Sequence, residues 1–181
     1  MKKLIGYITA TAALIATCSF NLNAGDLPQP KPGSKEFEKM KSLVGTWKGK
    51  TDVGQGPIEM TVQYRLLAGG TVLEERCFPG SPMEMLTMYY DNKDGKLALT
   101  HYCILGNRPG MTLKSADAKT IRFDLDGNCG INIATEPHMH ALSVTFDDSD
   151  TITTACKALM NGQETPEHPC TLKRVKEVAS K

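Results

Sequence analysis

The sequence carries little surplus charge of either sign and has no hydrophobic run long enough to cross a bilayer. Its 181 residues include 21 Lys and Arg against 20 Asp and Glu, which gives a formal net charge of +1. Because nucleic-acid binding depends on clustered Lys and Arg, this balance argues against a nucleic-acid partner. The N-terminal apolar stretch, residues 4–16, is shorter than the roughly 20 residues of a membrane-spanning helix, so we expect no membrane span.

Helical periodicity is scarce, and the sequence has no internal repeat. Apolar residues follow helical spacing at Phe37, Met40 and Val44. Ser34 precedes them as a candidate N-cap, and Gly45 follows as a candidate terminator. This pattern predicts a short amphipathic helix that lays its apolar stripe on one end of the domain.

The first residues have the pattern of a targeting sequence. Lys2 and Lys3 precede the apolar stretch, and Ala24 supplies the small residue that a signal peptidase requires at its cleavage site. We therefore predict a signal peptide over residues 1–24 and a periplasmic or secreted location.

Two further features lie close to the predicted cleavage site. Residues 14–18 resemble a lipobox that ends at Cys18, so a lipid anchor at Cys18 is the alternative to soluble export. Residues 25–33 contain three prolines, which favour an extended linker without a core of its own. The folded domain is then expected over residues 34–178.

From Trp47 onward the dominant period is two. Between Ile58 and Leu66, apolar residues alternate with polar ones, as in a strand with one buried and one exposed face. Similar segments follow at residues 71–78, 84–90, 96–105, 111–114, 120–125, 138–146, 151–160 and 170–175. About ten short strands joined by tight turns predict an all-β fold, an antiparallel up-and-down barrel with a short N-terminal helix. A two-sheet sandwich is the alternative.

The segment Gly45-Thr46-Trp47 resembles the entry to the first strand of the calycins, which include lipocalins, fatty-acid-binding proteins and nitrobindin-like barrels. In lipocalins this Trp closes the base of the barrel, and an Arg from the last strand lies across it. The resemblance implies the same arrangement for Trp47 and Arg174.

Four short motifs are similar to those of a bacterial family of exported lipocalin-like proteins. The motifs are Phe78-Pro79-Gly80, His101-Tyr102-Cys103, Gly106-Asn107-Arg108-Pro109 and His138-Met139-His140. This resemblance covers most of residues 43–174. It implies a lipocalin-like fold and brings no established activity with it.

These motifs place polar side chains on two predicted inner faces. In the predicted strand over residues 96–105, His101 and Cys103 fall in phase with leucines. In the predicted strand over residues 138–146, His138 and His140 fall in phase with the apolar residues that follow. A buried polar group costs stability unless a partner satisfies it. We therefore predict that these four residues bind a ligand, and that His101, Cys103 and His140 share one cavity.

Several interpretations of the four residues remain open. Their N and S donors suit zinc or iron, and by analogy with nitrobindin-like barrels the cavity would suit haem. Cys103 could instead be a nucleophile with His101 or His140 as its base, although no oxyanion motif accompanies it. The remaining alternative is a purely structural role, in which the four side chains are core residues hydrogen-bonded to the backbone or to buried water.

Asn107 and Arg108 follow directly on the strand that contains His101. We expect them at one rim of the barrel, where Arg108 would receive an anionic group of the ligand or would simply be solvated. Both are included in the predicted ligand site.

An odd number of cysteines follows the predicted cleavage site: Cys77, Cys103, Cys129, Cys156 and Cys170. Cys156 and Cys170 flank an Asn-Gly turn nearly symmetrically, which predicts a disulfide between them. Cys77 and Cys129 would form a second disulfide, leaving Cys103 free beside the histidines.

The leading functional hypothesis is an exported binding module that holds a small apolar or haem-like ligand inside the barrel. One alternative is a metal-dependent or thiol-based redox enzyme built on the same inner face. Another is a packed envelope protein that acts through its surface. No catalytic residue is assigned.

Overall fold

The computed structural model describes residues 30–52, 56–127 and 129–176. The predicted signal peptide, the candidate lipid anchor at Cys18 and residues 25–29 of the predicted linker lie outside the described residues. Within the described ranges, no helix is long and apolar enough to cross a membrane.

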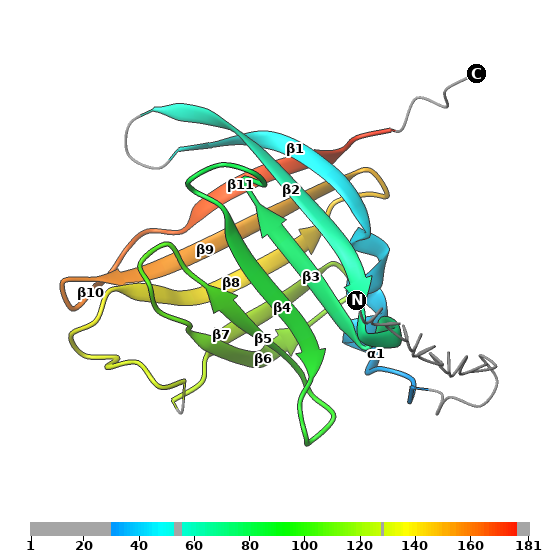
Figure 1. Ribbon diagram of the computed structural model, residues 1–181, viewed down its shortest axis with the longest axis horizontal. Helices are drawn as coiled ribbons and strands as arrows, with labels where there is room; N and C mark the ends of the chain where they lie inside the picture. Colours follow the sequence, from blue (N-terminus) through cyan, green and yellow to red (C-terminus); the bar gives the residue numbers. More distant parts are fainter. Residues whose placement is uncertain (1–29, 53–55, 128, 177–181) are drawn as a thin grey trace, which may run out of the picture.

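Within these residues, ten antiparallel strands form a closed barrel (Figure 1). The strands are β1 (Gly45–Asp52), β2 (Pro57–Leu67), β3 (Val72–Cys77), β4 (Met85–Asp91), β5 (Leu97–Tyr102), β6 (Gly110–Ala116), β7 (Thr120–Leu125), β8 (His138–Phe146), β9 (Thr151–Met160) and β11 (His168–Arg174). Each strand from β1 to β9 pairs with the next, and β11 lies between β9 and β1. A two-residue strand, β10 (Gln163–Glu164), pairs with the end of β9. The predicted barrel is confirmed, and the pairing of β11 with β1 excludes an open sandwich.

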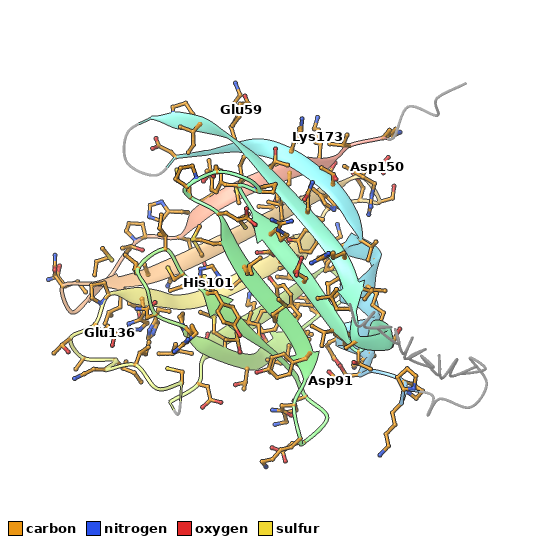
Figure 2. All side chains as sticks on the ribbon, in the orientation of Figure 1. Glu59, Asp91, His101, Glu136, Asp150 and Lys173 are labelled. Carbon is orange, nitrogen blue, oxygen red and sulfur yellow. The ribbon has the colours of Figure 1, made fainter. Side chains whose placement is uncertain are left out.

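The predicted N-terminal helix is present as α1 (Lys35–Met40). Ser34 caps it, because its hydroxyl oxygen accepts a hydrogen bond from a backbone N–H of the first turn, 3.1 Å away. The same hydroxyl donates to Asp91 Oδ1 at 2.7 Å, which ties the start of α1 to the end of β4. Figure 2 shows Asp91 beside α1.

A 3-10 turn, η2 (Lys41–Leu43), continues the helix. Because a 3-10 turn has three residues per turn, the buried stripe runs through Phe37, Met40 and Leu43. Val44, predicted to lie on that stripe, is 41% exposed.

Trp47 and Arg174 close the barrel at the end covered by α1. They stand opposite each other in the register of β1 and β11, and the guanidinium carbon lies 4.2 Å from the centre of the indole ring. The indole N–H donates to Leu43 O at 2.7 Å. Arg174 donates to Ser42 O at 2.7 Å and Val44 O at 2.8 Å. This is the arrangement that the resemblance to lipocalins implied.

The apolar core fills the interior at this closed end. Along β5 and β9, the fully buried residues are those near α1: Leu97, Leu99 and Ile152. The buried rings of Tyr89 and Phe123 also pack against each other in this core, with their centres 5.8 Å apart. Residues nearer the C-terminal ends of β5 and β9 line a cavity instead, which is described below.

The two predicted disulfides are not formed, because the five cysteines in the described residues are all free. In the register of β9 and β11, the residue opposite Cys170 is Thr154. Cys156 therefore lies two residues further along β9 from the position that a disulfide with Cys170 would need. Cys77 points into the barrel, whereas Cys129 lines a hollow on the outer face of the sheet. Both pairings are corrected by the strand register and by the side of the sheet on which each thiol lies.

Candidate ligand-binding site

A cavity of about 510 Å³ opens inside the barrel at the end opposite α1. It is lined at the ends of β1, β5 and β9 and at the starts of β4, β8 and β11, which meet there because neighbouring strands are antiparallel. Much of its wall is apolar: Met85, Leu105, Met139, Leu142, Ala158 and Met160. Glu136, labelled in Figure 2, lies in the loop before β8 at this end of the molecule.

A buried carboxylate, Glu75 on β3, forms part of the cavity wall. Its Oε2 accepts hydrogen bonds from the hydroxyls of Tyr64 at 2.7 Å and Tyr89 at 2.9 Å. Its Oε1 accepts from Thr87 Oγ1 at 3.2 Å and from Cys77 Sγ at 3.4 Å. Four neutral donors therefore hold a side chain that is only 8% exposed.

The electrostatic effect of Glu75 keeps its donors protonated. Burial first, and then the negative charge of Glu75, raises the pKa of Tyr64, of Tyr89 and of the Cys77 thiol well above their ordinary values. All three groups remain hydrogen-bond donors at neutral pH.

Sequence reasoning missed this carboxylate, although a signal was present. Glu75 alternates in phase with Leu73 and Cys77, which face the interior of the barrel. Two adjacent glutamates, Glu74 and Glu75, obscured the pattern, because one of them had to face inward whichever way the strand was turned. Glu74 lies on the other face, where it pairs with Arg65.

His101, predicted to bind a ligand, does line the cavity, and Thr87 connects it to Glu75. Its Nδ1 lies 3.0 Å from Thr87 Oγ1. Because the Thr87 hydroxyl hydrogen is donated to Glu75, Oγ1 accepts from Nδ1–H, and this network assigns the lone pair of the neutral ring to Nε2. Burial lowers the pKa of His101, an effect that the charge of Glu75 opposes, so the ring is neutral at pH 7.

His138 also lines the cavity, but both of its nitrogens are engaged within the protein. Nδ1 lies 2.6 Å from Glu136 O, and Nε2 lies 3.3 Å from His140 Nδ1. The side chain is fully buried. Its contacts are those of a structural histidine, whereas His101 is a buried histidine with one nitrogen facing the cavity. A third histidine of the cavity wall, His168, is exposed.

His140 does not enter the cavity, which corrects the prediction that it shares one with His101 and Cys103. The pairing of β8 with β9 shifts by one residue between Met139 and Ala141, so a β-bulge reverses the facing of the strand. Met139 takes the inward position, and His140 Nε2 lies 3.6 Å from Glu164 on β10.

Asn107 and Arg108 are also placed outside the cavity. The Asn107 amide donates to Glu136 Oε1 at 3.2 Å and Pro137 O at 2.7 Å, so it ties the β5–β6 loop to the segment before β8. Arg108 is exposed and lines the same outer hollow as Cys129. Neither side chain is positioned to contact a molecule held inside the barrel.

Three thiols face the cavity: Cys103, Cys156 and Cys170. Burial raises the pKa of Cys156 and Cys170, which favours the protonated thiol over the nucleophilic thiolate. Within the part of the chain that the structure describes, no three His, Cys, Asp or Glu side chains are arranged to hold a metal ion. The predicted ligand set of His101, Cys103, His138 and His140 is therefore not brought together as a metal site.

Comparison with known proteins leaves the family of this chain open. No family model matches it, and no curated protein matches it. One similar solved structure is a protein of unknown function from the DUF3598 family of Nostoc punctiforme, with 13% sequence identity and a TM-score of 0.41. The match covers 75% of this chain and 48% of that one, so the chain spans about half the length of the protein it resembles.

Proposed function

We propose that this protein is an exported lipocalin-like binding module that holds a small, mostly apolar molecule in the cavity at the open end of its barrel. The observation that carries the proposal is the cavity itself. Its volume of about 510 Å³ lies within the range of small-molecule sites. Its wall combines methionine and aliphatic side chains with a few polar groups, as such sites do. A packed envelope protein would have this space filled by side chains.

Haem is a second candidate ligand, favoured by one specific contact. A neutral His101 whose Nδ1–H is held by Thr87 presents Nε2 in the way that metal-ligating histidines are oriented by their partners. When bound, haem would supply an iron centre for redox or gas-binding chemistry. The contribution of the chain would be to hold that iron at His101 and to exclude water with the apolar wall. An absorption spectrum of the protein isolated from its native envelope distinguishes haem, by its Soret band, from a colourless ligand.

The binding proposal is tested with a neutral fluorescent probe, N-phenyl-1-naphthylamine, which brightens in apolar surroundings. We expect saturable binding that the Ala158→Trp variant weakens at least tenfold, because Ala158 lines the cavity. The matched control is Ala155→Trp on the same strand, since Ala155 lies on the opposite face of β9 and should leave binding unchanged. Equal binding by both variants would place the probe elsewhere and contradict the proposal.

The exported location has its own test. The intact mass of the protein isolated from cells should correspond to a chain that begins at residue 25. A mass that includes a diacylglyceryl group on Cys18 would indicate a lipid anchor, and an unprocessed chain would contradict export.

A further inference from the structure

We infer that the ligand carries an uncharged O–H or N–H donor, of the phenol or alcohol kind, which donates a hydrogen bond to Nε2 of His101. This inference rests on the proposed binding function and specifies its ligand class. The polar end of the ligand lies deep in the barrel, and its apolar body lies against the methionine and aliphatic wall.

The direction of the hydrogen bonds around Thr87 determines what His101 offers to the cavity. Glu75 accepts from four neutral donors, and one of them is the single hydroxyl hydrogen of Thr87. Thr87 can then only accept from His101, which fixes the hydrogen of the neutral ring on Nδ1. Nε2 makes no hydrogen bond to any residue that the structure describes. It therefore presents an acceptor to the cavity and requires a donor.

Glu75 makes the deep end of the cavity unfavourable for an anion. Its partners within the described residues are hydroxyls and a thiol, so no cation neutralises it there. The lysine of the described cavity wall, Lys157, is partly exposed, and its ammonium lies 3.5 Å from Glu164 Oε2. A fatty-acid carboxylate placed beside His101 would face a like charge without a compensating partner. A ligand ammonium would instead have to be stripped of water in a largely apolar cavity.

Four probes with one shared ring system separate these possibilities: 2-naphthol, 2-methoxynaphthalene, naphthalene-2-carboxylate and 2-naphthylmethylammonium. Titration calorimetry at pH 7.5 should rank 2-naphthol first. It should bind about tenfold more tightly than 2-methoxynaphthalene, which lacks the donor. The carboxylate should bind more weakly than either.

Two variants locate the effect. In His101→Leu, the preference for naphthol over its methyl ether should disappear, while binding of the ether itself persists and shows that the cavity is intact. In Thr100→Val, a control on the same strand whose side chain lies on the outer face of the barrel, the tenfold preference should remain. Glu75→Gln should reduce the preference, because Thr87 is then free to donate to His101 and the acceptor at Nε2 is no longer fixed.

The outcomes distinguish this inference from the binding function on which it rests. Equal binding of naphthol and its ether by the unmodified protein overturns the inference and leaves the binding function standing. If the carboxylate binds most tightly and Lys157→Met abolishes this binding, the polar contact of the ligand is Lys157 and the inference is wrong. Tightest binding of the ammonium probe would show that Glu75 receives a cation. If none of the four probes binds, both proposals fail.

Discussion

Two of the histidines in the cavity wall, His101 and His138, have the same chemistry but opposite roles, set by the partners of their ring nitrogens. His138 has partners for both nitrogens, Glu136 O and His140 Nδ1. His101 has one partner, Thr87, and presents its other nitrogen to the cavity. The difference has consequences for stability that can be measured without knowing the ligand.

We predict that His138→Leu lowers the free energy of unfolding by about 1 to 3 kcal/mol, because it removes the partner of two partly buried polar groups, Glu136 O and His140 Nδ1. His101→Leu should change the stability of the empty protein by less than about 1 kcal/mol, because Thr87 keeps its bond to Glu75. Chemical denaturation of the two variants provides the comparison. A larger loss for His101→Leu would identify it as the structural histidine.

The lowered pKa of His101 gives stability a defined pH dependence. The folded state favours the neutral ring, so the unfolded chain binds more protons between the folded pKa and the usual value of 6.5. The free energy of unfolding should therefore be fully retained above pH 6.5 and should fall as the pH drops through the folded pKa. The other titratable groups of the cavity wall are Asp52, Glu75, Cys103, His138, Cys156, Lys157, His168 and Cys170.

The control for this pH dependence is His101→Leu, which should flatten the curve just below pH 6.5. The carboxylates with lowered pKa values, Glu38, Glu84, Asp117 and Asp148, lose their contribution at still lower pH. An unchanged slope in the variant would show that another group titrates in this range.

Strand alternation predicted the inward facing of His101 and Cys103 correctly, because β5 is regular up to Tyr102. It failed for His140, because a bulge depends on how two strands meet and leaves no mark in the alternation of one strand. Glu75 was missed for a related reason: burial of a carboxylate becomes plausible only when its donors are known, and these come from β2 and β4.

At the scale of elements, strand existence was easier to predict than register. The bounds of β7, β8 and β9 coincide with those expected from the sequence, since turn-forming residues flank each of them. The relative position of β9 and β11 was not predictable, because β10 and the residues that follow it set the offset.

That offset predicts how the protein responds to reductant. Because no disulfide joins Cys156 to Cys170, adding dithiothreitol should leave the melting temperature unchanged. A disulfide closing a loop of this size would contribute about 3 kcal/mol, and its reduction would lower the melting temperature visibly. Alkylation of the unfolded protein, with and without reductant, provides the control and should give equal masses.

Over the whole molecule, the two ends of the barrel are specialised differently. The end under α1 is sealed by Trp47 and Arg174, and the opposite end holds the cavity. Damage at the sealed end should therefore affect stability without affecting the binding of a probe in the cavity.

We predict that Arg174→Ala lowers the free energy of unfolding by about 2 kcal/mol, since it removes charge-assisted bonds to Ser42 O and Val44 O and the contact with Trp47. Lys173→Ala, one residue away on the exposed face, should have almost no effect. Probe affinity should be the same in both variants. A large loss of affinity in Arg174→Ala would indicate that the two ends are coupled.

The pairing of β1 with β11 also determines when the barrel can form. This pair joins the first strand to the last, so the ring closes across almost the entire described domain. Contacts between distant parts of a chain are slow to form, because the entropy of loop closure is lost before the contacts stabilise it. Docking of β11 should therefore be a late step in folding. Because His168 and Cys170 of β11 line the cavity, its wall is incomplete before that step. A molecule that needs the whole wall would then act on folding by stabilising the finished barrel.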